Sequence, residues 1–88
     1  MRTRISSHEI AVWQAVAAKD GWTTARELES TLTGKVSPRT IRAHLRKLAA
    51  RGVLQVVETF DGFRYRAMMS CHGEALAYAR ALENAALV

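Results

Sequence analysis

What this chain has little of already excludes several classes of protein. A single cysteine cannot form an intramolecular disulfide, and a lone thiol is typical of a reducing compartment. No apolar run approaches the roughly 18 residues that cross a bilayer, and the basic start of the chain is not followed by the apolar segment of a secretion signal. We therefore expect a cytoplasmic protein that does not associate with a membrane.

Acidic residues are missing from the middle of the chain. Residues 30–57 contain six cationic side chains and no Asp or Glu, although the net charge of the whole chain is only +5. The six are Lys35, Arg39, Arg42, Arg46, Lys47 and Arg51. Basicity concentrated in one segment is typical of a surface that binds a polyanion, with nucleic acid as the leading candidate. The 49% hydrophobic content indicates a folded domain rather than a disordered basic tail.

The sequence also lacks the motifs of catalysis and of cofactor binding. It has neither a glycine-rich phosphate-binding loop nor a Gly-x-Ser-x-Gly elbow, so we expect no enzyme activity and no cofactor. Cys71 and His72, with His8 and His44 elsewhere, invite comparison with a metal sensor. Adjacent Cys and His is not a spacing that supplies the three or four ligands of tetrahedral zinc, so we predict no metal site.

Helical periodicity and capping residues predict four helices in a single domain, residues 1–88. The first helix, residues 6–20, begins with a capping box formed by Ser6 and Glu9 and is closed by Gly21. Its expected core residues are Ile10, Trp13 and Ala17, with Val12 and Val16 beside them.

The second and third predicted helices are short and strongly amphipathic. The second spans residues 24–32, and the third spans residues 37–51 with Ser37 as its cap and Pro38 in its first turn. The expected core residues are Ala25, Leu28 and Leu32 in the second helix, and Ile41, Leu45 and Leu48 in the third. On the third helix the cationic residues lie opposite this core face, which favours a binding surface over a merely solvated one because we expect no acidic residue to pair with it.

Two β-rich runs joined by Asp61-Gly62 predict a hairpin over residues 53–69 with a type I′ turn. That turn would pair Phe60 with Phe63, Glu58 with Tyr65, Val56 with Ala67 and Leu54 with Met69. The face expected to join the core carries Leu54, Val56, Phe60, Phe63, Tyr65, Ala67 and Met69. The outward face carries Arg64 and Arg66 with Gln55, Val57, Thr59 and Met68.

Aromatic residues are few, at 7% of the chain, and in so small a domain we expect them in the core rather than in a ligand pocket. This expectation covers Trp13 and Trp22. It also covers Phe60 and Phe63, which would pack over the base of the hairpin.

Residues 22–69 carry the motifs of a known fold. Trp22-Thr-Thr-Ala-Arg-Glu-Leu28 precedes Val36-Ser-Pro-Arg-Thr-Ile-Arg-Ala-His-Leu-Arg-Lys-Leu48, and Gly52-Val-Leu and the hairpin follow. In this order the segments resemble the winged helix-turn-helix of bacterial transcriptional regulators, such as the DeoR-like, MarR-like and ArsR-like groups. The resemblance implies an α+β, mainly α fold with a three-helix core and a hairpin wing, to which residues 73–87 add a further helix.

The resemblance also implies sequence-specific binding to double-stranded DNA by a small regulator or repressor of a bacterial, phage or plasmid system. The third helix would enter the major groove, which admits one α-helix, and the wing would contact the backbone or the minor groove. The candidates for reading bases are Arg39, Thr40, Arg42 and Ala43. The candidates for phosphate contacts are Lys35, Ser37, Arg46 and Lys47, with Arg64 and Arg66 on the wing.

We expect a homodimer on a pseudo-palindromic site, because one such module buries only roughly 600–1,000 Å². The expected dimer contact is largely the helix over residues 73–87, whose apolar flank carries Leu76, Ala79, Leu82 and Ala86, with the first helix as a second candidate. No small-molecule effector is expected, and control by protein concentration or by a partner protein is simpler. Two alternatives stay open: an adaptor that docks Phe60, Phe63 and the last helix onto another protein, and an architectural DNA-binding protein of plasmid partition or replication control.

Overall fold

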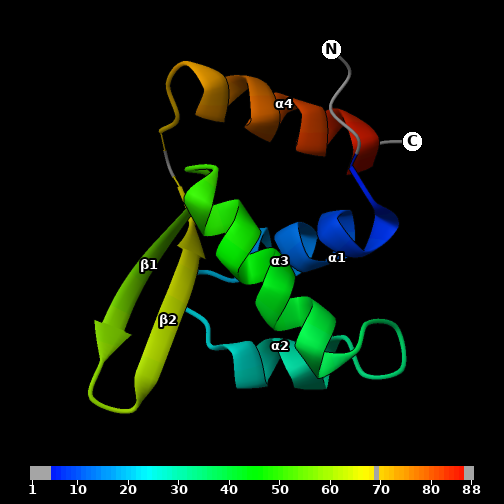
Figure 1. Ribbon diagram of the computed structural model, residues 1–88, viewed down its shortest axis with the longest axis vertical. Helices are drawn as coiled ribbons and strands as arrows, with labels where there is room; N and C mark the ends of the chain where they lie inside the picture. Colours follow the sequence, from blue (N-terminus) through cyan, green and yellow to red (C-terminus); the bar gives the residue numbers. More distant parts are fainter. Residues whose placement is uncertain (1–4, 69, 87–88) are drawn as a thin grey trace.

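The computed structural model describes residues 5–68 and 70–86 of the chain (Figure 1). Its elements are α1 (Ser7–Ala17), α2 (Ala25–Thr31), α3 (Pro38–Ala50), β1 (Leu54–Thr59), β2 (Gly62–Ala67) and α4 (Glu74–Ala86). In Figure 1, α3 crosses in front of α1, with α2 at one end of the molecule, α4 at the other and the hairpin projecting at the side. The predicted arrangement is therefore confirmed, while residues 69 and 87 of the predicted hairpin and last helix lie outside the described residues.

Leucine, isoleucine and valine side chains from the helices and from β1 form one core. The inward-facing positions predicted for α2 and α3 are confirmed: Leu28, Ile41, Leu45 and Leu48 have no exposed surface, Leu32 is buried and Ala25 packs against the cluster. The other core residues are Val12, Val16, Val36, Val53, Leu54, Tyr78 and Leu82. Burial of a complete i, i+4, i+7 stripe fixes the face of α3 that is turned away from solvent.

α1 is shorter than predicted. It ends at Ala17 rather than at residue 20, and Gly21, with a φ of 121°, lies in the turn that follows instead of closing the helix. Ser6 caps the first turn as predicted, since its hydroxyl accepts a hydrogen bond from the backbone N–H of Glu9 (3.1 Å). The side chain of Glu9 does not complete a capping box, because it points into the protein interior.

The face that α1 buries also differs from the prediction. The buried residues are Glu9, Val12 and Val16, whereas Ile10 and Trp13 are half-buried and Ala17 is exposed. Apolar residues occur on nearly every side of this helix, so their spacing does not single out one face.

The hairpin has a register two residues away from the predicted one. The pairs are Leu54–Ala67, Gln55–Arg66, Val56–Tyr65, Val57–Arg64, Glu58–Phe63 and Thr59–Gly62. Phe60 and Asp61 therefore occupy the turn. Among the described residues only glycines have a positive φ, here Gly62 at 124°, whereas a type I′ turn needs two successive positive values. Because the shift is an even number of residues, the side chains within β1 and β2 still lie on the faces predicted for them, whereas Phe60 is in the turn.

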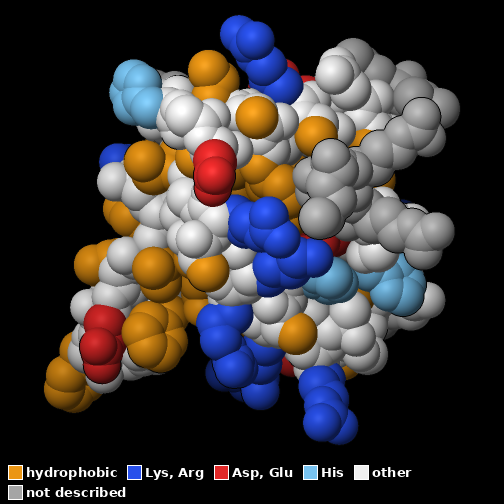
Figure 2. Space-filling model, turned by 45° about the horizontal axis from the view of Figure 1, so that its top comes forward, with side chains coloured by type: hydrophobic (Ala, Val, Ile, Leu, Met, Phe, Trp, Pro, Cys, Tyr) orange, Lys and Arg blue, Asp and Glu red, His pale blue; other side chains and the backbone are white. Residues whose placement is uncertain are grey.

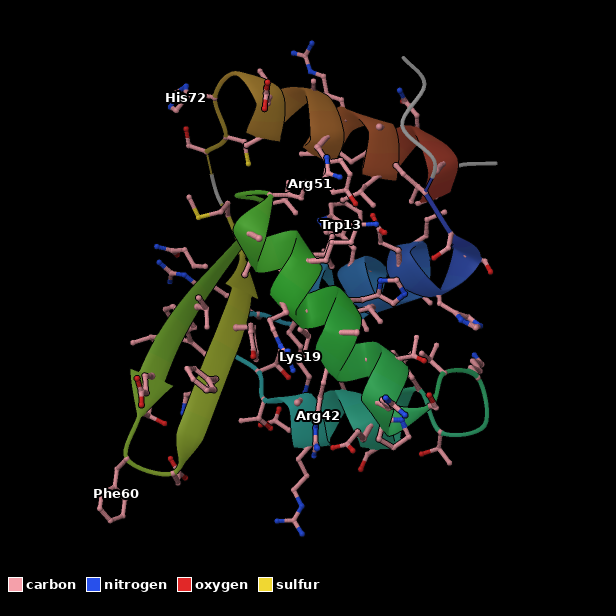
Figure 3. The ribbon with its side chains drawn as sticks, viewed as in Figure 1. Trp13, Lys19, Arg42, Arg51, Phe60 and His72 are labelled. Carbon is pink, nitrogen blue, oxygen red and sulfur yellow. The ribbon has the colours of Figure 1, made fainter. Side chains whose placement is uncertain are left out.

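Only the base of the hairpin joins the core. Leu54 is buried, but Val56 and Phe63 are 47% and 54% exposed, and Phe60 is fully exposed at the turn. Figure 3 shows Phe60 pointing away from the tip. The prediction that the phenylalanines cover the base of the wing is wrong, because the hairpin projects beyond the helices that could have covered them.

A short segment before α2 attaches the hairpin to the helices. Thr23 forms an antiparallel bridge with Tyr65, with N–H to O distances of 2.8 and 2.7 Å in the two directions. The neighbouring Trp22 is 38% exposed rather than in the core, and the guanidinium of Arg66 lies 4.6 Å from the centre of its ring. Trp13, by contrast, packs against the core.

α4 packs on the protein's own α1. Tyr78 and Leu82 are buried there, while Leu76, on the predicted apolar flank, is 38% exposed. The guanidinium of Arg51, just after α3, lies 5.0 Å from the centre of the Tyr78 ring and joins the two helices (Figure 3). None of the helices in residues 5–68 and 70–86 has the length and apolar character required to cross a membrane.

Candidate nucleic-acid interface

α3 separates an apolar face from a cationic one. Opposite the buried stripe, Arg39, Arg42, Ala43, Arg46 and Lys47 are exposed, as the helical spacing predicted, and Thr40 is partly exposed. Figure 2 shows Lys and Arg side chains gathered over the middle and lower part of this face of the molecule, beside a mostly hydrophobic hairpin. This surface can therefore contact a large anionic partner without rearrangement of the core.

The beginning of α3 is fixed by local hydrogen bonds. The Ser37 hydroxyl accepts a hydrogen bond from the backbone N–H of Thr40 (3.3 Å) and donates one to the Thr40 hydroxyl (2.9 Å). Pro38 occupies the first turn, where its missing N–H costs nothing. Ser37 therefore has a structural role in holding the first turn of α3, on which Arg39 and Thr40 lie.

The cations of this face differ in whether they form ion pairs with other residues of the chain. Within residues 5–68 and 70–86, no ion pair involves Lys35, Arg39 or Arg46. Arg42 lies 3.7 Å from the carboxylate of Glu29, and its side chain is 62% exposed. Exposed pairs of this kind contribute about 0–1 kcal/mol, so Arg42 can readily exchange Glu29 for another anion.

Lys47 is held by a buried carboxylate. Its ammonium lies 2.7 Å from Oε1 of Glu9, whose side chain is only 1% exposed, against 42% for Lys47. Oε2 of Glu9 is buried with no hydrogen-bond partner among the described residues. The expectation that no acidic residue pairs with the basic helix is therefore wrong. The sequence gives no signal for this pair, because its two residues are 38 positions apart.

His44 lies beside the same carboxylate, with Nδ1 3.8 Å from Oε1 of Glu9. Burial lowers the pKa of His44 below 6.5; Lys47 and His8 lower this pKa further, and Glu9 opposes them. The imidazole is therefore mainly neutral at pH 7. Lys47 is then the cation that balances Glu9 within the described residues.

The two wing arginines share one face, as predicted, but have different neighbours. Arg64 lies 3.9 Å from the exposed carboxylate of Asp61. A hydrogen bond from the Thr59 hydroxyl, then one from its own backbone N–H and then the charge of Arg64 lower the pKa of Asp61. Arg66 donates a hydrogen bond to the side chain of Gln55 and stacks on Trp22, so it is more firmly held than Arg64.

A hollow of about 580 Å³ lies between α2 and the turn of the hairpin. It is lined by Thr24, Arg26, Glu27, Ser30, Asp61 and Arg64. Arg26 is exposed and lines the same hollow as Arg64, and it is a site residue that the sequence pattern did not predict. It lies outside the acid-free segment, and only the fold brings it near the wing.

The adjacent Cys71 and His72 have separate neighbours. The thiol of Cys71 donates a weak hydrogen bond to the carbonyl of Gly52 (3.8 Å), and Nε2 of His72 lies 3.4 Å from the Ser70 hydroxyl. No group of three or more His, Cys, Asp or Glu side chains in the described part of the chain is arranged to hold a metal ion.

Residues 5–82 of the chain match the sequence model of a family described as penicillinase repressor. The matched segment includes α1, α2, α3 and the hairpin completely and most of α4. The match agrees with the winged-helix fold but does not single out the DeoR-like, MarR-like or ArsR-like groups that the motifs resemble. A comparison with curated proteins gave no match.

Proposed function

Because the chain belongs to the penicillinase repressor family, it is a winged-helix, DNA-binding transcriptional repressor, and we propose that it reads DNA with α3 in the major groove. The family consists of repressors and not of enzymes. The observation that carries the proposal is the two-faced α3. Its buried stripe ties it to the core, and its opposite face presents arginines and a small alanine to solvent.

The N-terminal half of α3 supplies the residues that read bases. Arg39 and Arg42 can each donate two hydrogen bonds to O6 and N7 of guanine, and the small Ala43 allows close approach or contact with a thymine methyl group. Thr40 can donate to or accept from a base edge, although its hydroxyl already accepts a hydrogen bond from Ser37. Arg42 gives up its long contact with Glu29 in this arrangement.

Phosphate contacts come from residues around this helix. We assign them to Lys35, Arg46 and Arg64, to the helix N-terminus capped by Ser37, and to Arg26 across the hollow from the wing. Arg66 would reach the backbone only by leaving Trp22 and Gln55. Lys47 is left out of this set because Glu9 holds its ammonium.

The repressor acts on DNA in the cytoplasm as a dimer, with residues 1–88 of each copy as one DNA-binding domain. A dimer is proposed because a single module of this size buries too little surface for tight specific binding. Its contact would lie on α4, but Tyr78 and Leu82 are already buried within the chain, which leaves Leu76 and its exposed neighbours. We therefore expect weak association in solution and pairing on a pseudo-palindrome with half-sites about one helical turn apart.

Selection of bound duplexes from a random pool tests this function. Two related half-sites should emerge, and analytical ultracentrifugation should find two chains on each selected duplex. A pool without enrichment would overturn the proposal. Spreading, repetitive occupancy in a footprint would instead indicate the architectural alternative.

Two single substitutions separate the proposed roles on the selected duplex. Arg39→Ala should cost about 1–3 kcal/mol and relax preference at one base position. Arg46→Ala should weaken binding to all sequences alike, because a phosphate contact carries no sequence information. Equal effects of Arg39→Ala on every sequence would move Arg39 to the phosphate contacts.

A further inference from the structure

The charge cluster of Glu9, His44 and Lys47 joins α1 to the proposed DNA-reading helix. Its carboxylate lies in the interior, and both of its neighbours on α3 lie on the flank between the buried stripe and the arginine face. Burial lowers the pKa of His44 and so favours its neutral form, which leaves the Lys47 ammonium as the close ionic partner of Glu9 among the described residues. Within residues 5–68 and 70–86, the titratable groups that face His44 are Glu9 and His8 from α1 and Lys47 from its own helix.

A phosphate contact that draws the Lys47 ammonium away from Glu9 would cost Lys47 this partner. Leaving Glu9 would strand a carboxylate that is 1% exposed, one oxygen of which already has no hydrogen-bond partner in the described part of the chain. Breaking a buried ion pair leaves an uncompensated charge and is strongly destabilising, whereas no ion pair within residues 5–68 and 70–86 is lost when Arg39 or Arg46 contacts a phosphate. Moving the side chain to a phosphate therefore costs more free energy for Lys47 than for the arginines beside it.

We infer that Glu9 is a positioning residue of the DNA-binding surface. It holds Lys47 on the α1 side of α3, so that this helix offers Arg39, Arg42 and Arg46 to the DNA and withholds the fourth cation. The contact also joins the flank of α3 to the buried face of α1. The inference rests on the proposed DNA binding by α3 and adds to it which cation is excluded.

The salt dependence of binding counts the phosphate contacts, because the slope of log K against log salt changes by about 0.9 for each one. We would measure this slope between about 50 and 200 mM salt with one selected duplex, for the wild type and for Glu9→Gln, Lys47→Gln and the double variant. Arg46→Gln is the positive control, because it removes a proposed phosphate contact. Lys19→Gln, at an exposed lysine after α1 that pairs with Glu27, is the matched control away from α3.

Lys47 should contribute to the salt dependence only when Glu9 is replaced. Lys47→Gln and Lys19→Gln should keep the wild-type slope, and Arg46→Gln should make it shallower by about 0.9. Glu9→Gln should make it steeper by about 0.9, because the released ammonium now reaches a phosphate, and the double variant should return to the wild-type value.

Two results would overturn the inference. One is a slope that Lys47→Gln reduces as much as Arg46→Gln does; the other is the same slope for Glu9→Gln and for the double variant. If Lys47→Gln fails to fold because it strands Glu9, the second comparison still decides, since neither of its proteins contains a buried unpaired charge. A wild type with no salt-dependent binding would instead contradict the proposed function itself.

Discussion

Replacing Leu45 by alanine should lower the unfolding temperature substantially, whereas the same replacement at the next residue, Arg46, should leave it almost unchanged. The two side chains leave α3 in different directions: Leu45 has no exposed surface and belongs to the core, and Arg46 is exposed. The pair therefore tests whether α3 is divided into a structural face and a binding face.

The size of the difference follows from burial. Removing a buried leucine side chain costs about 2–5 kcal/mol of stability. The whole free energy of unfolding of an 88-residue domain is about 4–13 kcal/mol. With an unfolding entropy of about 2.1 cal/mol/K per residue, each kcal/mol shifts the midpoint by about 5 °C, so Leu45→Ala should lower it by about 10–25 °C. Substitutions of exposed residues change the stability by at most about 0.5 kcal/mol, so Arg46→Ala should shift the midpoint by at most about 3 °C.

Thermal unfolding followed by circular dichroism measures the change in stability. Titration of a labelled duplex, at a temperature where both variants are folded, measures the change in DNA affinity. Leu45→Ala should retain most of the affinity per folded molecule, and Arg46→Ala should lose affinity at full stability. Two results would refute this division of α3: an unfolding midpoint that falls by less than about 5 °C for Leu45→Ala, or one that falls by about 5 °C or more for Arg46→Ala.

Three further predictions concern single features of the fold. Ser37→Ala should destabilise the domain by about 1 kcal/mol, and Ser37→Gly by only a few tenths, because the lost hydroxyl caps α3; thermal unfolding of both variants checks this. Gly34→Ala should cost about 1–2 kcal/mol although there is open space beside Gly34, since its φ of 80° is unfavourable for a residue with a side chain; a cost near zero would contradict this. The folded protein holds the pKa of His44 below 6.5, so the unfolded chain takes up a proton there first as the pH falls. The free energy of unfolding should therefore hold above pH 6.5 and decline below it, and denaturant titrations should show less decline for His44→Gln.

The sequence predicts α3 well because its residues separate cleanly into two kinds. Ile41, Leu45 and Leu48 are the apolar residues of a helix that is otherwise basic or small, so one spacing fits and the structure has it. In α1 the same reasoning selects Ile10 and Trp13, because apolar residues occur all around that helix. Which side is buried there depends on contacts with α3 and α4, which no local pattern contains.

The candidate site shows the same limit. Exposure of the α3 cations follows from helical spacing, but the pairing of Lys47 depends on Glu9, far away in the chain, whose acidic side chain is expected at the surface from its type alone. On the wing, Asp61-Gly62 predicted the hairpin correctly, yet the turn begins one residue earlier, and this places Phe60 at the tip. Arg66 could not be recognised as a partner of Trp22 before the bridge between Thr23 and Tyr65 brought the two together.

The exposed face of α3 is the surface proposed to contact DNA. Titration of the isotopically labelled protein with a selected duplex, followed by amide chemical shifts, tests it residue by residue. The largest changes should fall on residues 35–47, with a second group around Arg64 and little change on the exposed side of α4 away from the dimer contact. Changes confined to α4 and α1, with α3 silent, would contradict the account.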